Sequence, residues 1–389
     1  MLISAVAIGV FTFVGVVAYI DGLSVQLIRT AIELRGGHIQ ISGTGYFENP
    51  ALRTRITGMT EVAQILDNFD GLRFAAQQRA SGMISSAEQS AGITVVGVDP
   101  AQEEYVSPIP TLMVEGEWLS GDAEAGEVIM GTALAERLGV LLGERVVLMV
   151  SDLAGDVSAG AYRIRGLFTS NSTEYDKRHV LMHESAMDAL TGFPPNAAST
   201  FAIILDADQD IRQVSAALRG ALSEKNVEVL TWLDRSPMLV MMDEMMNLTN
   251  VILVVILFTA IGFTLINSFI MVIFERIREI GIMAAGGVRP GQVRLLLFLE
   301  ASFVVLLGAG VGIVLSAGVL GWWSAVGLDL SAFAEGLSRF GAGTVIRPYV
   351  NIGRMASGFA LIFVMAFLAV LYPAIKASRF KIVDAMNHA

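Results

Sequence analysis

The residues best suited to metal chemistry are two histidines four positions apart. His179 and His183, with Glu184 directly after them, have a spacing that would place metal ligands on one face of a helix. The residues between them, Val-Leu-Met at 180–182, instead predict a strand, on which positions i and i+4 lie about 13 Å apart. We therefore expect no metal site here.

The chain lacks the sequence motifs of nucleotide binding and of acyl transfer. The chain contains no Gly-x-x-x-x-Gly-Lys-[Ser/Thr] phosphate loop and no Gly-x-Ser-x-Gly elbow that would order a serine nucleophile. It also has no cysteine, so disulfides and thiolate metal sites are excluded. We expect a chain that is not an enzyme and holds no cofactor of its own.

One carboxylate lies within an otherwise uncharged run. Between Leu295 and Leu328 the only charged residue is Glu300, and an acid inside a membrane can serve as a proton or substrate site. Glu300 follows Arg294 by six residues, about 9 Å along a helix, so it is expected near the membrane surface. There it can pair with a basic residue or extend to water, and we favour this structural role.

Apolar runs of membrane-spanning length dominate the chain. Of its 389 residues 54% are hydrophobic, and the mean hydropathy is +0.62. About 20 helical residues cross a hydrocarbon core. Four uncharged stretches qualify as spans: Leu2–Ile20, Met246–Phe274, Ala301–Leu328 and Met355–Ile375.

Charge is distributed unevenly along the chain. Residues 21–245 hold 16 basic and 31 acidic side chains, a balance of −15, whereas 275–294 and 376–389 together hold 7 basic and 3 acidic ones, a balance of +4. Basic loops normally stay in the cytosol, so the acidic domain is predicted to lie on the other side of the membrane. An acidic domain also argues against nucleic acid as a partner.

The domain between the first two spans reads as mixed α/β. After a stalk that continues the first helix to Gly36-Gly37, strands are predicted at 38–42, 72–76 and 93–98, with a helix over 61–69. A β-rich stretch follows from about 105 to 190, with a helix at 132–138 and strands at 143–149 and 162–168. The β-α-β pattern then returns at 201–205, 211–222 and 227–230.

Two further motifs concern helix surfaces. Met238, Met241, Met242 and Met245 lie on the first turns of a helix that begins at Pro237; such a stripe can bind greasy cargo or can simply pack against another helix. In the third span, Gly308 and Gly312 form a small-xxx-small pair. This pair predicts a close contact with another helix, within the chain or across a dimer.

The segment between the second and third spans is the strongest candidate for function. It reads Glu275-Arg276-Ile277-Arg278-Glu279-Ile280-Gly281, and an apolar stripe at 277, 280 and 284 predicts a short amphipathic helix. From the pattern alone, it is either a loop whose arginines fix topology or a helix that docks on a cytosolic partner. Its residue order, with Gln292-Val293, Glu300-Ala301 and the tail motif Pro373-Ala374 to Arg379, resembles the ABC-transporter permeases that include MacB, LolC, LolE and FtsX.

The resemblance implies a fold and a set of partners. It implies an α+β membrane protein with four transmembrane helices and a large mixed α/β extracytoplasmic domain, made of a porter-like α+β part and an inserted β-rich subdomain. Residues 275–281 would couple to a cytoplasmic ABC ATPase dimer, which would hold the ATP and Mg. A second permease subunit, identical or related, would complete an inner-membrane complex in contact with membrane lipid.

The implied function is transport or regulation. The permease would use ATP hydrolysis by a separate subunit to move periplasmic domains and extract an amphiphilic cargo such as a lipoprotein. The alternatives are an FtsX-like role that controls a periplasmic partner such as a cell-wall hydrolase, and MacB-like efflux of drugs or peptides. The predicted divisions are 1–35, first span and stalk; 36–236, extracytoplasmic domain; 237–274, stalk and second span; 275–291, coupling helix; 292–325, third span; 326–353, outer loop; 354–376, fourth span; 377–389, cytoplasmic tail.

Overall fold

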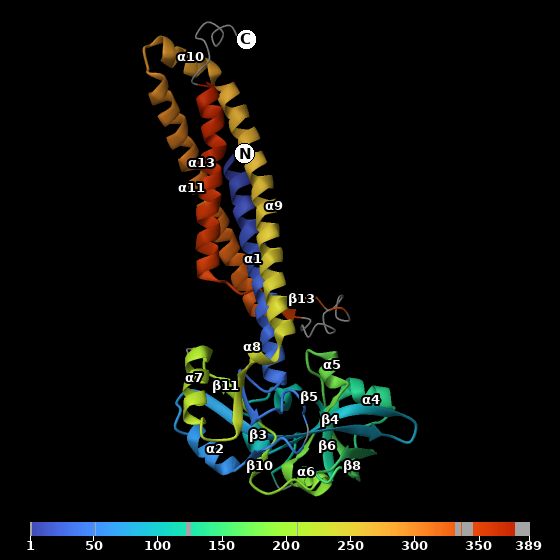
Figure 1. Ribbon diagram of the computed structural model, residues 1–389. Coiled ribbons are helices and arrows are strands. Elements are labelled where there is room, and N and C mark those ends of the chain that lie inside the picture. The colour runs from blue at the N-terminus through green and yellow to red at the C-terminus, as the bar shows by residue number, and fades with distance from the viewer. Residues whose placement is uncertain are drawn as a thin grey trace. The chain divides into compact units, whose positions relative to one another are not determined.

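The computed structural model describes residues 2–50, 52–121, 126–207, 209–330, 336 and 345–377. These residues form two compact units (Figure 1). The helical unit comprises the described residues up to 25, 242–329 and 345–377, and the mixed α/β unit comprises mainly residues 26–241. The helices α1 (Leu2–Leu34) and α9 (Pro237–Glu275) each continue without interruption from one unit into the other.

One large sheet runs through the α/β unit. Its strand order is β12-β1-β11-β3-β4-β9-β6-β8-β5, with β7 paired to both β3 and β8. The strands are β1 (Ile39–Gly43), β3 (Leu72–Ser85), β4 (Ser90–Val98), β5 (Met113–Gly116), β6 (Glu127–Gly131), β7 (Arg145–Ser151), β8 (Val157–Phe168), β9 (His179–His183), β11 (Thr200–Leu205) and β12 (Val227–Thr231). A short pair, β2 (Ile56–Thr57) and β10 (Ala197–Ala198), lies beside it.

The long strand β3 joins the two parts of this unit. Its first half, Leu72–Gln77, pairs with β11, and its second half pairs with β4 and β7. The sequence predicts only residues 72–76 as a strand there, because Gln77, Gln78 and Arg79 interrupt the apolar pattern. The predicted β-rich stretch at 105–190 therefore shares one continuous sheet with the remainder of the domain.

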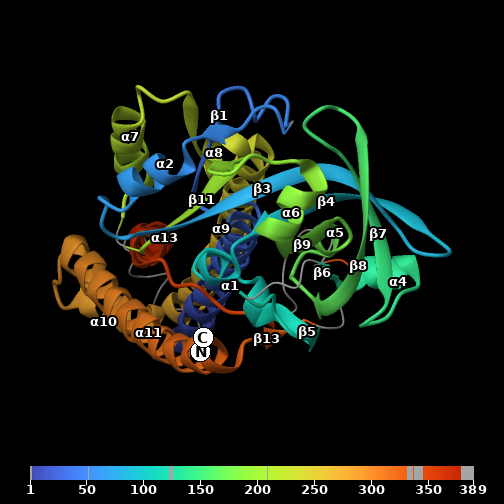
Figure 2. The same cartoon turned by 90° about the horizontal axis from the view of Figure 1, so that it is seen from below.

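Helices cover both ends of the sheet (Figure 2). α2 and α7 lie at the β1–β12 end, where Val62, Leu66 and Leu218 pack against Ile41 and Phe201. At the other end, α4 and α6 bury apolar side chains against β4, β6 and β7. The helices of this unit are α2 (Met59–Leu66), α3 (Pro100–Glu103), a 3-10 turn at Ile109–Leu112, α4 (Thr132–Leu138), α5 (Thr173–Asp176), α6 (Glu184–Thr191), α7 (Ile211–Ala221) and α8 (Trp232–Arg235).

The last turns of α1 are part of the α/β core. Ile32 packs with Ala202 and Ile204 of β11, and Leu34 packs with residues of β4 and β9. The helix ends as predicted at the glycine pair, where Gly36 and Gly37 both have positive φ and the Gly37 amide donates to the Ile32 carbonyl.

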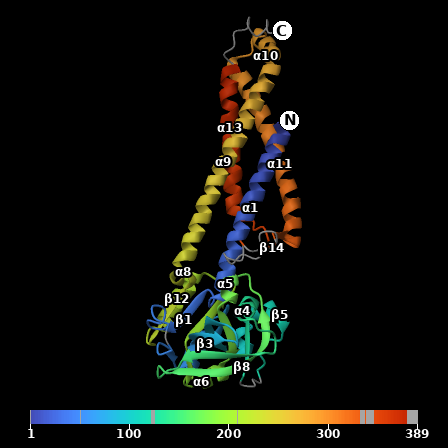
Figure 3. The same cartoon turned by 90° about the vertical axis from the view of Figure 1, so that its right-hand side faces the viewer.

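Within the described residues, long helices make up the helical unit (Figure 3). Besides α1 and α9 they are α11 (Pro290–Val326) and α13 (Ile352–Ala377), with the short helix α10 (Ile277–Ala285) between α9 and α11 and a strand pair formed by β13 (Leu328–Asp329) and β14 (Val345–Ile346). Phe13 of α1 lies at the centre of their shared core. Its ring is 5.4 Å from that of Phe258 and 6.2 Å from that of Phe359, centroid to centroid.

Three of the helices, α1, α9 and α11, are long and apolar enough to cross a membrane. The fourth predicted span corresponds to α13, whose described apolar part is Ile352–Met365. The count of four spans therefore stays a prediction. The predicted tail beyond residue 377 and the middle of the predicted outer loop, residues 331–335 and 337–344, lie outside the described residues.

Candidate functional site

The helices α9 and α11 form a hairpin, and α10 is the segment between them. Arg276 is the one non-helical residue between α9 and α10. α9 ends at Glu275 and α10 begins at Ile277. The Arg276 side chain donates from Nε to Glu279 Oε2 at 2.9 Å, and from Nη1 to the two carboxylate oxygens of Glu300 at 2.5 and 2.8 Å. This Arg276 clamp, formed by Arg276, Glu279 and Glu300, ties α10 to α11. Glu300 thus has a structural partner, which is Arg276, across the hairpin.

One face of α10 packs against α11. Ile280 is only 8% exposed and lies in a small cluster with Met283, Val293 and Leu297. The adjacent Gly281 is buried as well. The amphipathic segment is therefore a helix, as its spacing predicts, and Ile280 holds it in place.

The opposite face of α10 is exposed. Ile282 is 60% exposed, and Glu275, Arg278 and Glu279 are exposed too. The side chain of Ile277 lies outside what the structure describes. The predicted coupling residues thus divide into a buried supporting part and an exposed part, and Ile282 joins the exposed part although the sequence pattern did not single it out.

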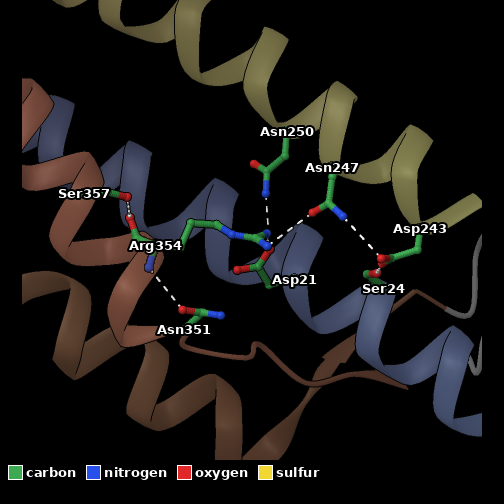
Figure 4. Close-up of polar contacts among 8 residues, drawn as sticks. All are labelled: Asp21, Ser24, Asp243, Asn247, Asn250, Asn351, Arg354 and Ser357. Atoms are coloured by element: carbon green, nitrogen blue, oxygen red, sulfur yellow. Dashed lines mark hydrogen bonds and ion pairs between the residues drawn. The ribbon is translucent and has the colours of Figure 1, made fainter. Parts of the chain in front are cut away.

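A second polar group connects three helices near residue 21 (Figure 4). Asp21 of α1 is 5% exposed and forms an ion pair with Arg354 of α13. Arg354 Nη2 donates to Asn247 Oδ1 of α9 at 3.2 Å, and Asn250 Nδ2 donates to Asp21 Oδ1 at 3.2 Å. We call Asp21, Arg354, Asn247 and Asn250 the Asp21 cluster.

Neighbouring bonds extend the Asp21 cluster (Figure 4). The Ser24 hydroxyl donates to Asp243 Oδ1 at 3.0 Å, and Asn247 Nδ2 donates to Asp243 Oδ2 at 3.3 Å. At the start of α13, Asn351 Oδ1 accepts from the Arg354 amide at 3.1 Å. Sequence reasoning missed this site. Its signal was the acid directly after the first span together with two asparagines around the start of the uncharged run of α9.

The paired glycines of α11 lie against α1. A Cβ on Gly308 would lie 2.7 Å from Val6 Cβ, and one on Gly312 would lie 2.8 Å from Val10 Cβ and from the Ala7 carbonyl oxygen. Real Cβ atoms do not approach so closely. The two glycines therefore allow contact between helices of the same chain.

The methionine stripe on α9 is largely uncovered. Met238 is 84% exposed, Met241 and Met245 are each 63% exposed, and Met242 is half-buried. Flexible thioether side chains in this number form an adaptable apolar surface. Within the described residues, most of the methionine side chains of this stripe are not covered by other parts of the chain.

The two histidines do not form a metal site. Both lie on β9, where His179 Nδ1 bonds the Tyr175 carbonyl at 3.0 Å and the His179 ring stacks on that of Tyr175. His183 Nδ1 instead lies 2.8 Å from Ser185 Oγ at the start of α6. In the searched part of the chain, no group of three or more His, Cys, Asp or Glu side chains could hold a metal ion.

Three helices of the described chain that are long and apolar enough to cross a membrane, together with a mixed α/β unit, fit a membrane protein of the permease class. The family model of the MacB-like periplasmic core domain matches residues 1–221, and that of the FtsX-like permease C-terminal domain matches residues 250–382. The chain belongs to this family, as an ABC transporter permease of the MacB, LolC and FtsX type.

Two relatives match almost the whole of this chain, and one solved structure matches about half of it. The chain is 22% identical over 400 residues to the lipoprotein-releasing system transmembrane protein LolC of Neisseria meningitidis serogroup B, covering 99% of this chain and 93% of that protein. It is 23% identical to the macrolide export ATP-binding/permease protein MacB of Bdellovibrio bacteriovorus, covering 98% of this chain and 58% of that protein. The crystal structure of the periplasmic region of MacB from Actinobacillus actinomycetemcomitans is also similar, with 13% identity, a TM-score of 0.38, and coverage of 51% of this chain and 91% of that one.

Proposed function

We propose that this chain is the membrane subunit of an ABC complex in which a separate ATPase dimer binds ATP and Mg and docks on the exposed face of α10. The observation that carries the proposal is the packing of α10 against α11 through the face opposite to its exposed one. Ile280 is buried against α11, and the Arg276 clamp joins α10 to Glu300. A displacement applied to Arg278, Glu279 and Ile282 would therefore pass into α9 and α11.

The uninterrupted helices α1 and α9 would carry this displacement to the α/β unit. α1 contains 33 residues and α9 contains 39, and each helix has residues in both units. In this proposal the chain lies in the plasma membrane with four spans, its α/β unit faces the periplasm or cell exterior, and a second permease chain completes the complex.

The cargo that we propose is an amphiphile such as a lipoprotein. The similarity to LolC over almost the whole of both chains supports it, since that relative is named for lipoprotein release. The exposed methionine stripe offers an adaptable apolar surface of the kind that an acyl chain requires. The similarity to MacB over 98% of the chain favours a second candidate, the export of a drug or peptide.

The docking step is tested with Ile282→Asp in a complex co-expressed with its ATPase. We expect at least a tenfold loss of permease-stimulated ATP hydrolysis, because a carboxylate replaces an exposed apolar contact. Val114→Asp is the matched control: Val114 is 62% exposed on β5 of the α/β unit, and this change should leave stimulation unaltered. Unchanged stimulation in Ile282→Asp would reject the docking surface.

The cargo is tested separately, in proteoliposomes that contain a tagged lipoprotein. We expect ATP-dependent release of the lipoprotein to a soluble acceptor, and loss of release in Ile282→Asp. Full ATPase stimulation with no release of lipoprotein would overturn the cargo and keep the coupling role. Transport of a macrolide or peptide in the same liposomes would then support the second candidate.

A further inference from the structure

The α/β unit contains a pocket whose charge is opposite to that of the domain. The pocket has a volume of about 460 Å³. Its charged lining consists of four arginines and one acid, namely Arg35, Arg79, Arg178, Arg235 and Glu174, whereas residues 21–245 as a whole carry nearly twice as many acids as bases. The one acid is already paired, since Glu174 Oε1 lies 2.8 Å from Arg178 Nε.

The guanidinium of Arg235 is bound only to neutral oxygens. Its Nη1 donates to the Arg35 carbonyl at 2.7 Å and to Gln40 Oε1 at 2.5 Å, and its Nη2 donates to the Gly37 carbonyl at 2.7 Å. Its Nε is buried and has no hydrogen-bond acceptor among the described residues. Burial and the charge of Arg79 together lower the pKa of Arg235 to about 10, so the group is still cationic at neutral pH.

Arg79 is likewise held by a neutral group. Its Nε and Nη2 donate to Gln77 Oε1 at 3.2 and 2.7 Å, and the amide nitrogen of Gln77 in turn donates to the buried Glu103 carboxylate at 2.8 and 2.9 Å. Within the described chain, no carboxylate lies within 4 Å of the guanidinium of Arg35, Arg79 or Arg235. Two neighbouring half-buried cations with no carboxylate in direct contact repel each other, and an anion bound between them would offset that repulsion.

The uncharged residues that line the pocket also restrict which ligands it can bind. Tyr46, Phe47 and Pro50 line the pocket, and so does Tyr175, whose ring stacks on His179 with 3.7 Å between centroids and 8° between planes. The volume is in the range of sites that take small organic molecules. Guanidinium forks match phosphate and carboxylate oxygens, and aromatic rings accept a flat or apolar group beside them.

We propose that this pocket binds a small organic anion, a phosphate monoester or carboxylate that carries an aromatic or apolar group, with Arg79 and Arg235 as its principal ligands. A free metabolite or the headgroup of a lipid can supply this chemistry. The proposal is independent of the cargo proposed above and of ATPase docking.

The test is calorimetric titration of the full chain, in nanodiscs of phosphatidylcholine, with phenyl phosphate, inorganic phosphate and dihexanoyl phosphatidic acid. We expect phenyl phosphate or the short lipid to bind at least tenfold more tightly than inorganic phosphate. Tighter binding of phenyl phosphate identifies a soluble ligand, and tighter binding of the lipid identifies a headgroup. Equal affinity for all three probes, or no heat with any of them at millimolar concentration, overturns the proposal.

Arg79→Gln tests the assigned ligand, with Arg212→Gln on the exposed surface of α7 as its control. We expect Arg79→Gln to weaken binding at least tenfold and Arg212→Gln to leave it unchanged. Without ligand, Arg79→Gln should also unfold at a higher temperature than the native chain, because it removes repulsion from Arg235. Undiminished binding in Arg79→Gln would refute the role of Arg79 as a ligand, whatever the unfolding temperature.

Discussion

The Asp21 cluster makes a quantitative prediction about how three helices of the permease are joined. Arg354→Gln removes the only cation paired with Asp21 among the described residues and leaves an almost fully buried carboxylate. Asn250 still donates one hydrogen bond to Asp21 Oδ1, but Asp21 Oδ2 already lacks a partner within the described chain. The variant therefore leaves a buried, unpaired negative charge between α1, α9 and α13.

The size of the effect follows from the burial of the two partners. Breaking a fully buried ion pair costs roughly 3–5 kcal/mol. The Arg354 side chain is 39% exposed, so solvent screens part of this interaction, and we expect about 2–3 kcal/mol. For a unit of this size, that corresponds to a fall in unfolding temperature of about 5–10 °C.

A double-mutant cycle in detergent or nanodiscs measures this coupling. Asp21→Asn together with Arg354→Gln leaves no charge in the cluster, so the double variant should be more stable than Arg354→Gln alone, with a coupling free energy of about 2 kcal/mol. Arg278→Gln, an exposed change on α10, is the control and should not alter the unfolding temperature. Strictly additive effects of the two substitutions would refute the idea that the ion pair joins the helices.

Two further predictions concern packing and pH. Gly312→Val should lower the free energy of unfolding by about 1–3 kcal/mol and separate α11 from α1, because its Cβ would overlap Val10 and a backbone oxygen. Gly310→Ala is the control and should leave stability unchanged, because there is open space around Gly310. The unfolding temperature and the yield of monodisperse protein measure both effects. Burial lowers the pKa of His179 to about 4, so its contribution to stability is complete above pH 6.5 and is lost as the pH falls toward 4, by up to about 3 kcal/mol. Burial raises the pKa of Asp176 to about 6, so its contribution is present below pH 3.8 and is lost as the pH rises through 6. Between pH 4 and 6, His179→Gln should therefore make the α/β unit more stable on acidification relative to the native chain, and Asp176→Asn should do the reverse; identical slopes in thermal unfolding would contradict both assignments.

Local pattern predicted most of the regular elements. The helix at 132–138 and the strands at 201–205 and 227–230 match α4, β11 and β12 to within a residue, because each is an apolar segment bounded by Gly or polar residues. The strand at 72–76 was predicted too short. In β3, Gln77 and Gln78 are buried and bonded to Glu103 and Asp188, so a tertiary network replaces the apolar pattern on which strand prediction depends.

The candidate sites were less predictable, because they depend on contacts between distant segments. Periodicity placed Ile280 on an apolar stripe of α10 but could not indicate whether that stripe faces α11 or a partner. The Asp21 cluster joins positions 229 and 333 residues apart in the sequence, and the cationic pocket collects arginines from four separate segments. Each of the polar residues in these two sites is an ordinary side chain when its local sequence is read alone.

The helix α1 has apolar contacts in both units, and in the helical unit it also has a buried ion pair. In the α/β unit its last turns are held by apolar contacts, with Ile32 and Leu34 buried among strands. In the helical unit it is held by Phe13 and by the ion pair of Asp21 with Arg354. Apolar contacts tolerate small sliding, whereas a buried ion pair is lost within a few ångströms of separation, because the carboxylate then has no other cation. Within the helical unit, a displacement of α13 relative to α1 would therefore be resisted by the ion pair at Asp21 as well as by the apolar core around Phe13.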